Sequence, residues 1–299
     1  MVSIIVATYN GQKYLLAQLI SIAKQSYKNI EIIICDDASN DSTVEIIKEF
    51  AKSQANVSYF INETNIGVNK NFELGFLKAK GNFIAIADQD DIWLPNKIEE
   101  QMKLFIKDEI LLTHTASALF RGNNLPTKSY QKITNPFQGN DVQKLLLRNS
   151  VSGHNIIFRK QLLQQIFPIP KNIYYDWWIV QTAACNGYIA ASNKVLTYQR
   201  AHENNVTVKV RASKNQTEEE YQERIQALQN FLQLKNLTNT NKIFIEKTLQ
   251  QFSTLVNNNF SKSLFRFLLD NRKVFFYYKK GILKYFSQKK AAKHLSNKT

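Results

Sequence analysis

Apolar residues come in short blocks through the first hundred positions, and polar stretches separate the blocks. Apolar runs at 2–7, 30–35, 57–61 and 83–87 have the length of buried strands. Between the first two runs, apolar residues within 15–23 recur at three- and four-residue spacing, as on one face of a helix. Strands that alternate with helices form parallel sheets, so this part of the chain predicts an α/β fold.

From residue 110 onward the predicted elements are less regularly spaced. Residues 110–120 predict one or two strands, and 155–159 and 195–200 predict one strand each. A helix is predicted to begin at Tyr175 and to end near Gly187, because glycine is common just after the last helical residue.

Beyond residue 210 the strand pattern stops. Residues 218–234, 242–256 and 260–286 all carry helical periodicity. We therefore assign residues 1–208 to one α/β domain and residues 209–299 to a C-terminal helical region with a basic tail.

Three acidic residues follow the fourth predicted strand within four positions, at Asp88, Asp90 and Asp91. In open α/β sheets, ligands bind beyond the carboxyl ends of the strands. Asp88 and Asp90 offer the hard oxygen ligands that divalent cations prefer, and the ion would keep open positions for phosphate oxygens. We therefore predict a metal-dependent site for a nucleoside diphosphate. The alternative is that the acids only cap the helix predicted near Pro95.

Composition and length are those of a globular protein. The chain has 299 residues, of which 44% are hydrophobic and 21% charged, and it can bury a full core. No run approaches the ~20 apolar residues that span a bilayer. The first residues lack the basic segment of a signal peptide, and Cys35 and Cys185 predict free thiols in a reducing compartment. We therefore expect a cytoplasmic protein.

The net charge of +15 predicts a polyanionic neighbour. No acid follows Asp270, whereas nine lysines and arginines do. If 260–286 forms one helix, lysines lie opposite an apolar face. That face comprises Phe275, Tyr278, Ile282, Tyr285 and Phe286. The pattern is typical of a helix in an anionic membrane interface; the alternative is a helix packed on the domain with a solvated basic side.

Four short motifs occur in order along the α/β part. They are Ala7-Thr8-Tyr9-Asn10, Asp36-Asp37-Ala38-Ser39-Asn40-Asp41, Asn65-Ile66-Gly67 and Asp88-Gln89-Asp90-Asp91-Ile92-Trp93. As a set they resemble the family-2 inverting glycosyltransferases of GT-A fold, in particular the bacterial rhamnosyltransferase-like branch that builds surface polysaccharides. The resemblance covers residues 1–205 and implies a Rossmann-like, mixed and mostly parallel sheet flanked by helices.

The resemblance implies that the motif residues bind a UDP- or dTDP-linked sugar. Asp37 would accept a hydrogen bond from the imide N–H of the base, and the ring of Tyr9 would lie beside the base. Asp90, together with Asp88, would hold Mg²⁺ or Mn²⁺. The full set of donor-binding residues that it implies is Ala7, Thr8, Tyr9, Asp36, Asp37, Asn65, Lys70, Asp88 and Gln89.

Inverting transfer needs a base that takes the proton of the acceptor hydroxyl. The resemblance assigns this role to Asp176, where the family has Glu-Asp or His-Asp and this chain has Tyr175-Asp176. A helix N-terminus lowers the pKa of a carboxyl group, whereas burial against Trp177 would raise it; alternatively, Asp176 is only a helix cap. The residues expected on the donor-sugar or acceptor side are Asp91, His154, Trp177 and His202.

The resemblance further implies transfer of a single sugar, rhamnose or another hexose, to a lipid-linked glycan at the inner face of the membrane. Two alternatives stay open. A haloacid-dehalogenase-type phosphatase would use Asp88 as its nucleophile, but that family places its motif on the first strand. A nucleic-acid-binding protein would explain the charge, but no signature of that class occurs and we expect no nucleic acid as partner.

Overall fold

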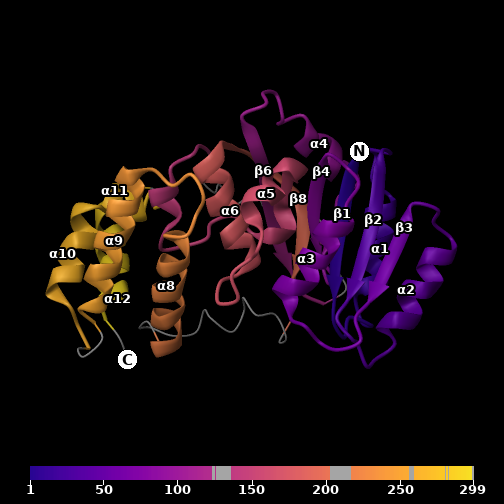
Figure 1. The fold of residues 1–299 in the computed structure, drawn as a ribbon, viewed down its shortest axis with the longest axis horizontal. Helices are drawn as coiled ribbons and strands as arrows, with labels where there is room; N and C mark the ends of the chain where they lie inside the picture. Colours follow the sequence, from indigo (N-terminus) through magenta and orange to yellow (C-terminus); the bar gives the residue numbers. More distant parts are fainter. Residues whose placement is uncertain are drawn as a thin grey trace.

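The computed structural model describes residues 1–122, 125, 136–202, 217–255, 259–279, 281 and 283–297 (Figure 1). Its first part alternates strands with helices, as the apolar pattern predicts. The elements are β1 (Val2–Thr8), α1 (Leu15–Ala23), β2 (Ile30–Asp36), α2 (Thr43–Lys52), β3 (Val57–Ile61), α3 (Val68–Lys78) and β4 (Phe83–Asp88).

The second part of the α/β region adds four strands to the same sheet. The elements are β5 (Ile92–Trp93), α4 (Lys97–Met102), β6 (Ile110–Phe120), β7 (Ile156–Arg159), α5 (Leu163–Ile166), α6 (Tyr175–Asn186) and β8 (Tyr188–Arg200). Residues 110–120 form one strand, and β8 begins seven residues before the predicted 195. The helix predicted at Pro95 begins at Lys97 instead.

The described strands form one sheet of eight in the order β3-β2-β1-β4-β7-β6-β8-β5. β1 lies parallel to β2 and β4, β2 to β3, and β6 to β8. β7 is antiparallel to both β4 and β6, and β5 is antiparallel to β8. The sheet is therefore mixed, and the parallel strands β1, β2 and β4 end at one common edge.

Helices cover both faces of the sheet. Ile4 and Ile32 point to the face that α1, α2 and α4 cover, and Ile5 and Ile33 point to the face that α3 and α6 cover. The alternation along β1 and β2 explains why these strands read as unbroken apolar runs, because both faces are buried.

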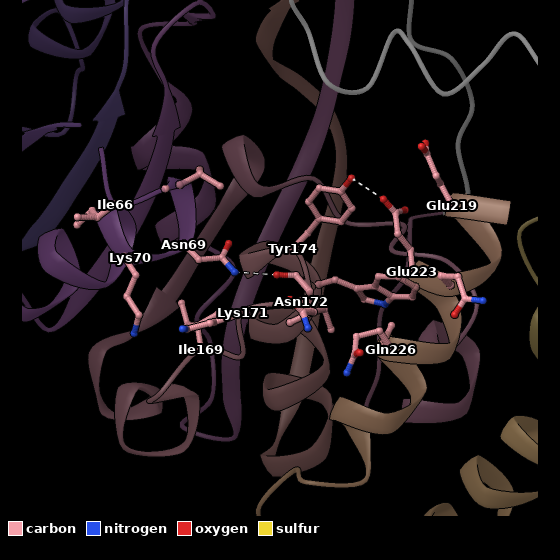
Figure 2. Close-up of a pocket in the computed structure, with 16 residues that line it drawn as sticks. Ile66, Asn69, Lys70, Ile169, Lys171, Asn172, Tyr174, Glu219, Glu223 and Gln226 are labelled. Atoms are coloured by element: carbon pink, nitrogen blue, oxygen red, sulfur yellow. Dashed lines mark hydrogen bonds between the residues drawn. The ribbon is translucent and has the colours of Figure 1, made fainter. Parts of the chain in front are cut away.

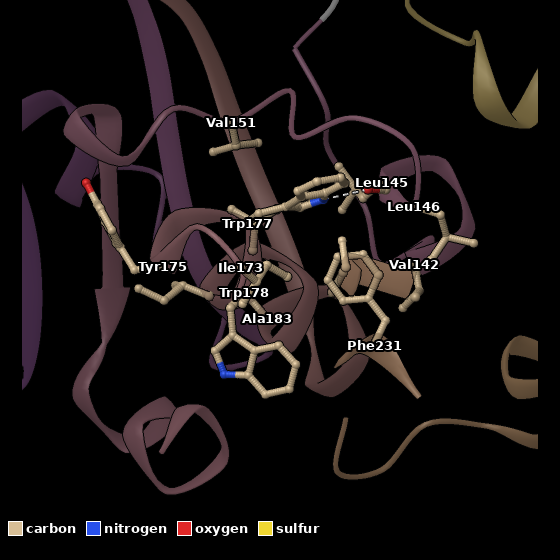
Figure 3. Packing of buried hydrophobic residues seen from close by; sticks show 14 of the residues in the cluster. Val142, Leu145, Leu146, Val151, Ile173, Tyr175, Trp177, Trp178, Ala183 and Phe231 are labelled. Atoms are coloured by element: carbon tan, nitrogen blue, oxygen red, sulfur yellow. Dashed lines mark hydrogen bonds between the residues drawn. The ribbon is translucent and has the colours of Figure 1, made fainter. Parts of the chain in front are cut away.

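The C-terminal helices join the α3–α6 side of this core. They are α8 (Glu218–Phe231), α9 (Asn239–Ser253), α10 (Lys262–Asp270), α11 (Arg272–Phe275) and α12 (Lys284–Leu295). Trp177 of α6 meets Phe231 of α8 edge to face, with ring centroids 5.4 Å apart, and its indole N–H donates to the Leu145 carbonyl at 2.7 Å (Figure 3). The predicted boundary at 208/209 lies outside the described residues.

The prediction of one helix over 260–286 is wrong. α10 ends before Asn271, and Gly281 has a φ of 96°, a left-handed conformation that glycine adopts readily. Phe275 is buried in the core, whereas Leu283, Tyr285 and Phe286 are exposed on or beside α12. The predicted apolar face is therefore split. None of the described helices is both long and apolar enough to cross a membrane.

Candidate active site

The carboxyl ends of β1, β2 and β4 bring the first predicted motifs together. Ala7 pairs with Asp88 across the β1–β4 register, and Thr8 pairs with Asp36 across β1–β2. Asp36 is fully buried; it accepts hydrogen bonds from the Thr8 hydroxyl at 2.8 Å and from the Ser39 backbone N–H at 2.9 Å. Asp36 therefore ties the two strand ends together and faces away from solvent.

Asp37 organises the turn that precedes α3. Its carboxylate accepts hydrogen bonds from the Asn62 side chain at 2.9 Å and from the backbone N–H groups of Ile66 at 2.8 Å and Gly67 at 2.9 Å. Asn65 donates to the Asp37 carbonyl at 3.3 Å, so it also holds this turn. Oδ1 accepts the bonds from Asn62 and Ile66, and Oδ2 accepts the bond from Gly67. Since each carboxylate oxygen can accept about two hydrogen bonds, Oδ2 can accept one more.

Gln89 joins the acid-bearing loop to the end of β1. Its amide oxygen accepts from the Tyr9 backbone N–H at 2.9 Å, and its amide nitrogen donates to the Tyr9 carbonyl at 3.0 Å. A Cβ at Gly11 would come within 2.3 Å of this amide oxygen, so a larger residue there would displace the Gln89 side chain. Gln89 thus fixes the backbone of Tyr9, a residue that is 46% exposed at the site edge.

Asp90 pairs with a histidine from the end of β8. Its Oδ2 lies 2.7 Å from His202 Nε2, and the backbone carbonyl of Asp90 accepts from Arg200 Nε at 3.0 Å. Burial and the charge of Asp88 raise the pKa of Asp90, and His202 partly offsets this rise. Both side chains are partly accessible, 15% for Asp90 and 21% for His202.

Asp91 and His154 form a buried charged cluster next to this pair. His154 Nδ1 lies 3.4 Å from Asp88 Oδ2 and 3.6 Å from Asp91 Oδ2, and the His154 carbonyl accepts from Lys97 Nζ at 3.2 Å. Burial raises the pKa of Asp91 to about 7 and lowers that of Lys97 to about 7. Burial alone would lower the pKa of His154, but the charges of Asp91 and Asp88 outweigh it.

Two sets of side chains in the described part of the chain could therefore hold a cation. Asp88, Asp91 and His154 offer ligand atoms within 4.8 Å of one another, and Asp90 and His202 offer the closer pair. The predicted pair, Asp88 and Asp90, contributes one residue to each set.

Asp176 lies in the first turn of α6. Its carboxylate accepts from the Trp177 backbone N–H at 2.7 Å and from the Gly153 backbone N–H at 3.1 Å. Burial, together with the charge of Asp88, outweighs these hydrogen bonds and raises the pKa of Asp176 to about 6. Tyr175, which replaces the usual acid or histidine, donates its hydroxyl to Asp88 Oδ1 at 3.4 Å. The carboxyl group is thus half-buried and close to the acids that follow β4.

Lys70 lies on α3 and is paired with an acid of the same helix. Its ammonium forms an ion pair with Glu73, whose other carboxylate oxygen accepts from the Ile169 backbone N–H at 2.6 Å. Lys70 also lines a pocket of about 940 Å³ between the start of α3, residues 169–174 and α8 (Figure 2). Trp177, predicted on the donor-sugar or acceptor side, contributes to the wall of the same pocket.

The family model "Glycosyl transferase family 2" matches residues 3–167, more than half of the chain. The chain belongs to glycosyltransferase family 2. A relative from Escherichia coli, named UDP-Glc:alpha-D-GlcNAc-diphosphoundecaprenol beta-1,3-glucosyltransferase WfgD, is 32% identical over 59% of this chain and 68% of its own length. The first three curated relatives are matched over 65% to 70% of their length.

Two solved structures show the same fold. Staphylococcus aureus TarS (residues 1–349, in complex with UDP-GlcNAc) superposes with a TM-score of 0.64 at 20% identity, covering 98% of this chain and 89% of its own. A Pyrobaculum calidifontis mannosyltransferase in complex with GDP-Man and Mn²⁺ gives 0.61 at 15% identity, covering 86% and 70%. The predicted α/β fold of GT-A type with added C-terminal helices is therefore confirmed, and the glycosyltransferase assignment replaces the two alternative functions.

Several residues of this family-2 site had no predicted role. Arg200 makes two bonds to the loop that carries Asp90 and Asp91, which we call the acid loop. Its side chain donates to the Asp90 carbonyl, and its backbone N–H donates to Asp91 Oδ1 at 3.1 Å. The Gly153 backbone N–H reaches Asp176, and Lys97 is buried beneath His154. In the sequence, Gly153 is next to His154 and Arg200 is two residues before His202. Their nearness to these two predicted site residues is the sequence feature that could have indicated a role for them.

Proposed function

We propose that this family-2 enzyme transfers one sugar from a UDP- or dTDP-linked donor to a hydroxyl of a lipid-linked glycan, with inversion at the anomeric carbon. The donor sugar would be rhamnose or another hexose, and the product would serve a bacterial surface polysaccharide. The observation that carries the proposal is the placement of Asp176, with its raised pKa, beside the acids that follow β4.

Asp176 would act as the base. With a pKa of about 6, its carboxylate is unprotonated near neutral pH and still basic enough to accept a proton. The acceptor oxygen would form a bond to the anomeric carbon while its proton passes to Asp176. The bond from that carbon to the diphosphate would break on the opposite face, and the nucleotide would leave with the electron pair.

Asp90 and His202 fit a divalent cation better than the buried set does. Cis ligands of one small ion stand about 3 Å apart, and Asp90 Oδ2 and His202 Nε2 are 2.7 Å apart. Both residues of this pair are partly accessible, whereas in the other set only Asp88 is exposed and Asp91 and His154 are almost fully buried, so an ion on Asp90 and His202 would be easier for a phosphate to reach. With Asp88, they would hold Mg²⁺ or Mn²⁺, which when bound would offset the charge that develops on the leaving diphosphate.

The nucleotide would lie over the ends of β1 and β2. Asp37 keeps an acceptor position on Oδ2 for the imide N–H that uracil and thymine share, and Tyr9, whose backbone Gln89 holds, offers an exposed side chain. The two structural neighbours, one in complex with UDP-GlcNAc and the other with GDP-Man and Mn²⁺, support a nucleotide-sugar donor and a cation. The name of the E. coli relative supports a lipid-linked acceptor.

A donor screen tests the proposal. The full chain would be incubated with Mn²⁺, a synthetic GlcNAc-α-diphosphoryl-lipid acceptor, and in turn UDP-glucose, UDP-GlcNAc, dTDP-rhamnose and GDP-mannose. We expect release of UDP or dTDP with one of the first three donors, and a single added sugar of inverted configuration by NMR. A product of retained configuration would contradict the mechanism. Release of nucleotide with none of these donors would contradict the proposed donor and acceptor.

The proposed location is the cytoplasmic face of the membrane, held by the start of α12. Leu283, Tyr285 and Phe286 are exposed, and Lys284, Lys289 and Lys290 flank them in a segment without acids. Apolar side chains beside lysines suit an anionic lipid surface. The alternative, a solvated basic side on a packed helix, accounts for the lysines but not for the exposed apolar groups.

The double variant Leu283→Ser/Phe286→Ser is expected to bind phosphatidylglycerol-containing vesicles about tenfold more weakly than wild type in a sedimentation assay. The matched control is Leu77→Ser/Ile106→Ser, which removes two other exposed apolar side chains far from α12. Equal vesicle binding by all three proteins would exclude α12 as the membrane contact.

A further inference from the structure

The pocket of about 940 Å³ forms where the α/β part meets the C-terminal helices (Figure 2). One wall is the start of α3, with Ile66 and Gly67, a second is the 169–174 segment, and α8 forms the third. The size is that of a site for a small ligand, and polar groups converge on a partly apolar interior.

We infer that this pocket binds the acceptor glycan, and that α8 contacts the hydroxyl groups of its sugar. The inference rests on the proposed function, because it names the place where the second substrate of that reaction binds. It also gives the C-terminal helices a part in substrate recognition.

The face of α8 toward the pocket carries groups that recognise sugars. Glu219, Gln222, Glu223 and Gln226 follow one another at helical spacing and all line the pocket. Carboxylates accept hydrogen bonds and amides both donate and accept, so together they match the mixed character of hydroxyl groups. Tyr174, 45% exposed, adds an aromatic ring and donates its hydroxyl to Glu223 at 3.4 Å.

Two residues that line the pocket, Gly67 and Tyr174, interact with residues of the proposed active site. The Gly67 backbone N–H, in the α3 wall, donates to Asp37 at 2.9 Å. Tyr174 precedes Asp176 by two residues, and the charge of Asp176 contributes, after burial and Glu223, to the raised pKa of Tyr174. Asp176 itself does not line the pocket, so an acceptor glycan bound against α8 would have to extend past Tyr174 to bring its hydroxyl to the base.

The pocket lining carries two lysines, Lys70 and Lys171, and two glutamates, and both glutamates lie on α8, so the α8 wall favours a neutral sugar over the diphosphate of the donor. Glu219 and Glu223 place two carboxylates on the α8 wall, and like charges repel a diphosphate. Lys70, on the opposite wall, is already paired with Glu73.

The pocket is held open by bonds between its walls. The Asn69 side chain donates to the Ile173 carbonyl at 2.8 Å and to the Pro170 carbonyl at 3.2 Å. Phe231 of α8 packs on Trp177 of α6, which fixes the helix against the α/β part. A ligand would therefore not have to order these walls, so binding costs less conformational entropy than it would in a pocket with mobile walls.

Saturation-transfer NMR on the full chain tests the inference with methyl α-glycosides of GlcNAc, glucose, galactose and rhamnose. We expect at least one glycoside to bind wild type, and Glu223→Ala/Gln226→Ala to weaken it about tenfold or more, since each loses hydrogen bonds to the sugar. Gln222→Trp, which fills the pocket, should abolish binding. The matched control, Glu246→Ala/Gln229→Ala, changes exposed residues that do not line the pocket and should bind normally.

The UDP-induced thermal shift of the same proteins separates the two proposals. A wild-type shift with UDP that the pocket variants keep, together with their loss of glycoside binding, is the expected result. Glycoside binding without any shift by a nucleotide would reject the proposed function and leave the pocket as a sugar site. Binding of no glycoside by wild type, equal binding by the pocket variants, or a loss of the UDP shift in those variants would overturn the inference.

Discussion

Replacement of Asp176 by asparagine is expected to lower kcat by about 10²- to 10⁴-fold, the usual contribution of a general base. The amide is nearly isosteric, and its oxygen can still accept from the Trp177 or Gly153 N–H. The nitrogen cannot accept a proton from the acceptor hydroxyl. Since Asp176 makes no bond to the predicted nucleotide residues, the UDP-induced thermal shift and the donor KM should stay close to wild type. Steady-state release of nucleotide in the presence of acceptor measures the effect.

The pH profile of wild type gives an independent measurement of the same group. The carboxylate form is the active one, so kcat should fall about tenfold per pH unit below the pKa of about 6 and level off above it. Asp270→Asn, at an exposed position on α10, is the matched control and should keep the wild-type rate and profile. A wild-type rate in Asp176→Asn, or a flat profile between pH 5 and 7, would remove Asp176 as the base.

Most of the sheet and the edge that carries the site could be predicted from the sequence. Apolar runs such as 2–7 and 30–35 are buried on both faces, and a parallel sheet must bring their carboxyl ends to one edge. The positions of Asp36, Asp37 and Asp88 follow directly. Asp37 and Asp36 could not be told apart in this way, because their different hydrogen bonds come from Thr8, Asn62 and the turn at Gly67.

The pairing of distant residues could not be predicted. His202 lies 112 residues after Asp90, and the antiparallel contact of β5 with β8, together with the Arg200 hydrogen bonds to Asp90 and Asp91, brings them together. In the tail the sequence predicted a contact that does not form. The helical periodicity of 260–286 predicts one continuous apolar face, but the helix is broken at Asn271 and Gly281. Local pattern indicates which side chains can share a face, whereas the turn geometry decides whether they do.

Removal of the Asp90–His202 pair is expected to have the second large effect. Asp90→Asn should lower kcat/KM by at least about 100-fold, because it takes the charged ligand from the proposed cation. His202→Ala should weaken binding of the cation and should also lower kcat/KM. The double variant should lose less transition-state stabilisation than the sum of the two single losses, because both residues bind the same ion. Calorimetric titration with Mn²⁺ in the presence of UDP measures the affinity for the cation directly.

This pair also decides between the two candidate cation sites. If the ion lies on Asp90 and His202, the rise in unfolding temperature that UDP and Mn²⁺ cause together disappears in both single variants. His294→Ala, on α12, removes a histidine far from the sheet edge and should keep the full rise. If instead His202→Ala binds Mn²⁺ as wild type does, the ion lies on Asp88, Asp91 and His154. The 2.7 Å contact of His202 with Asp90 would then hold the acid loop in place without a cation.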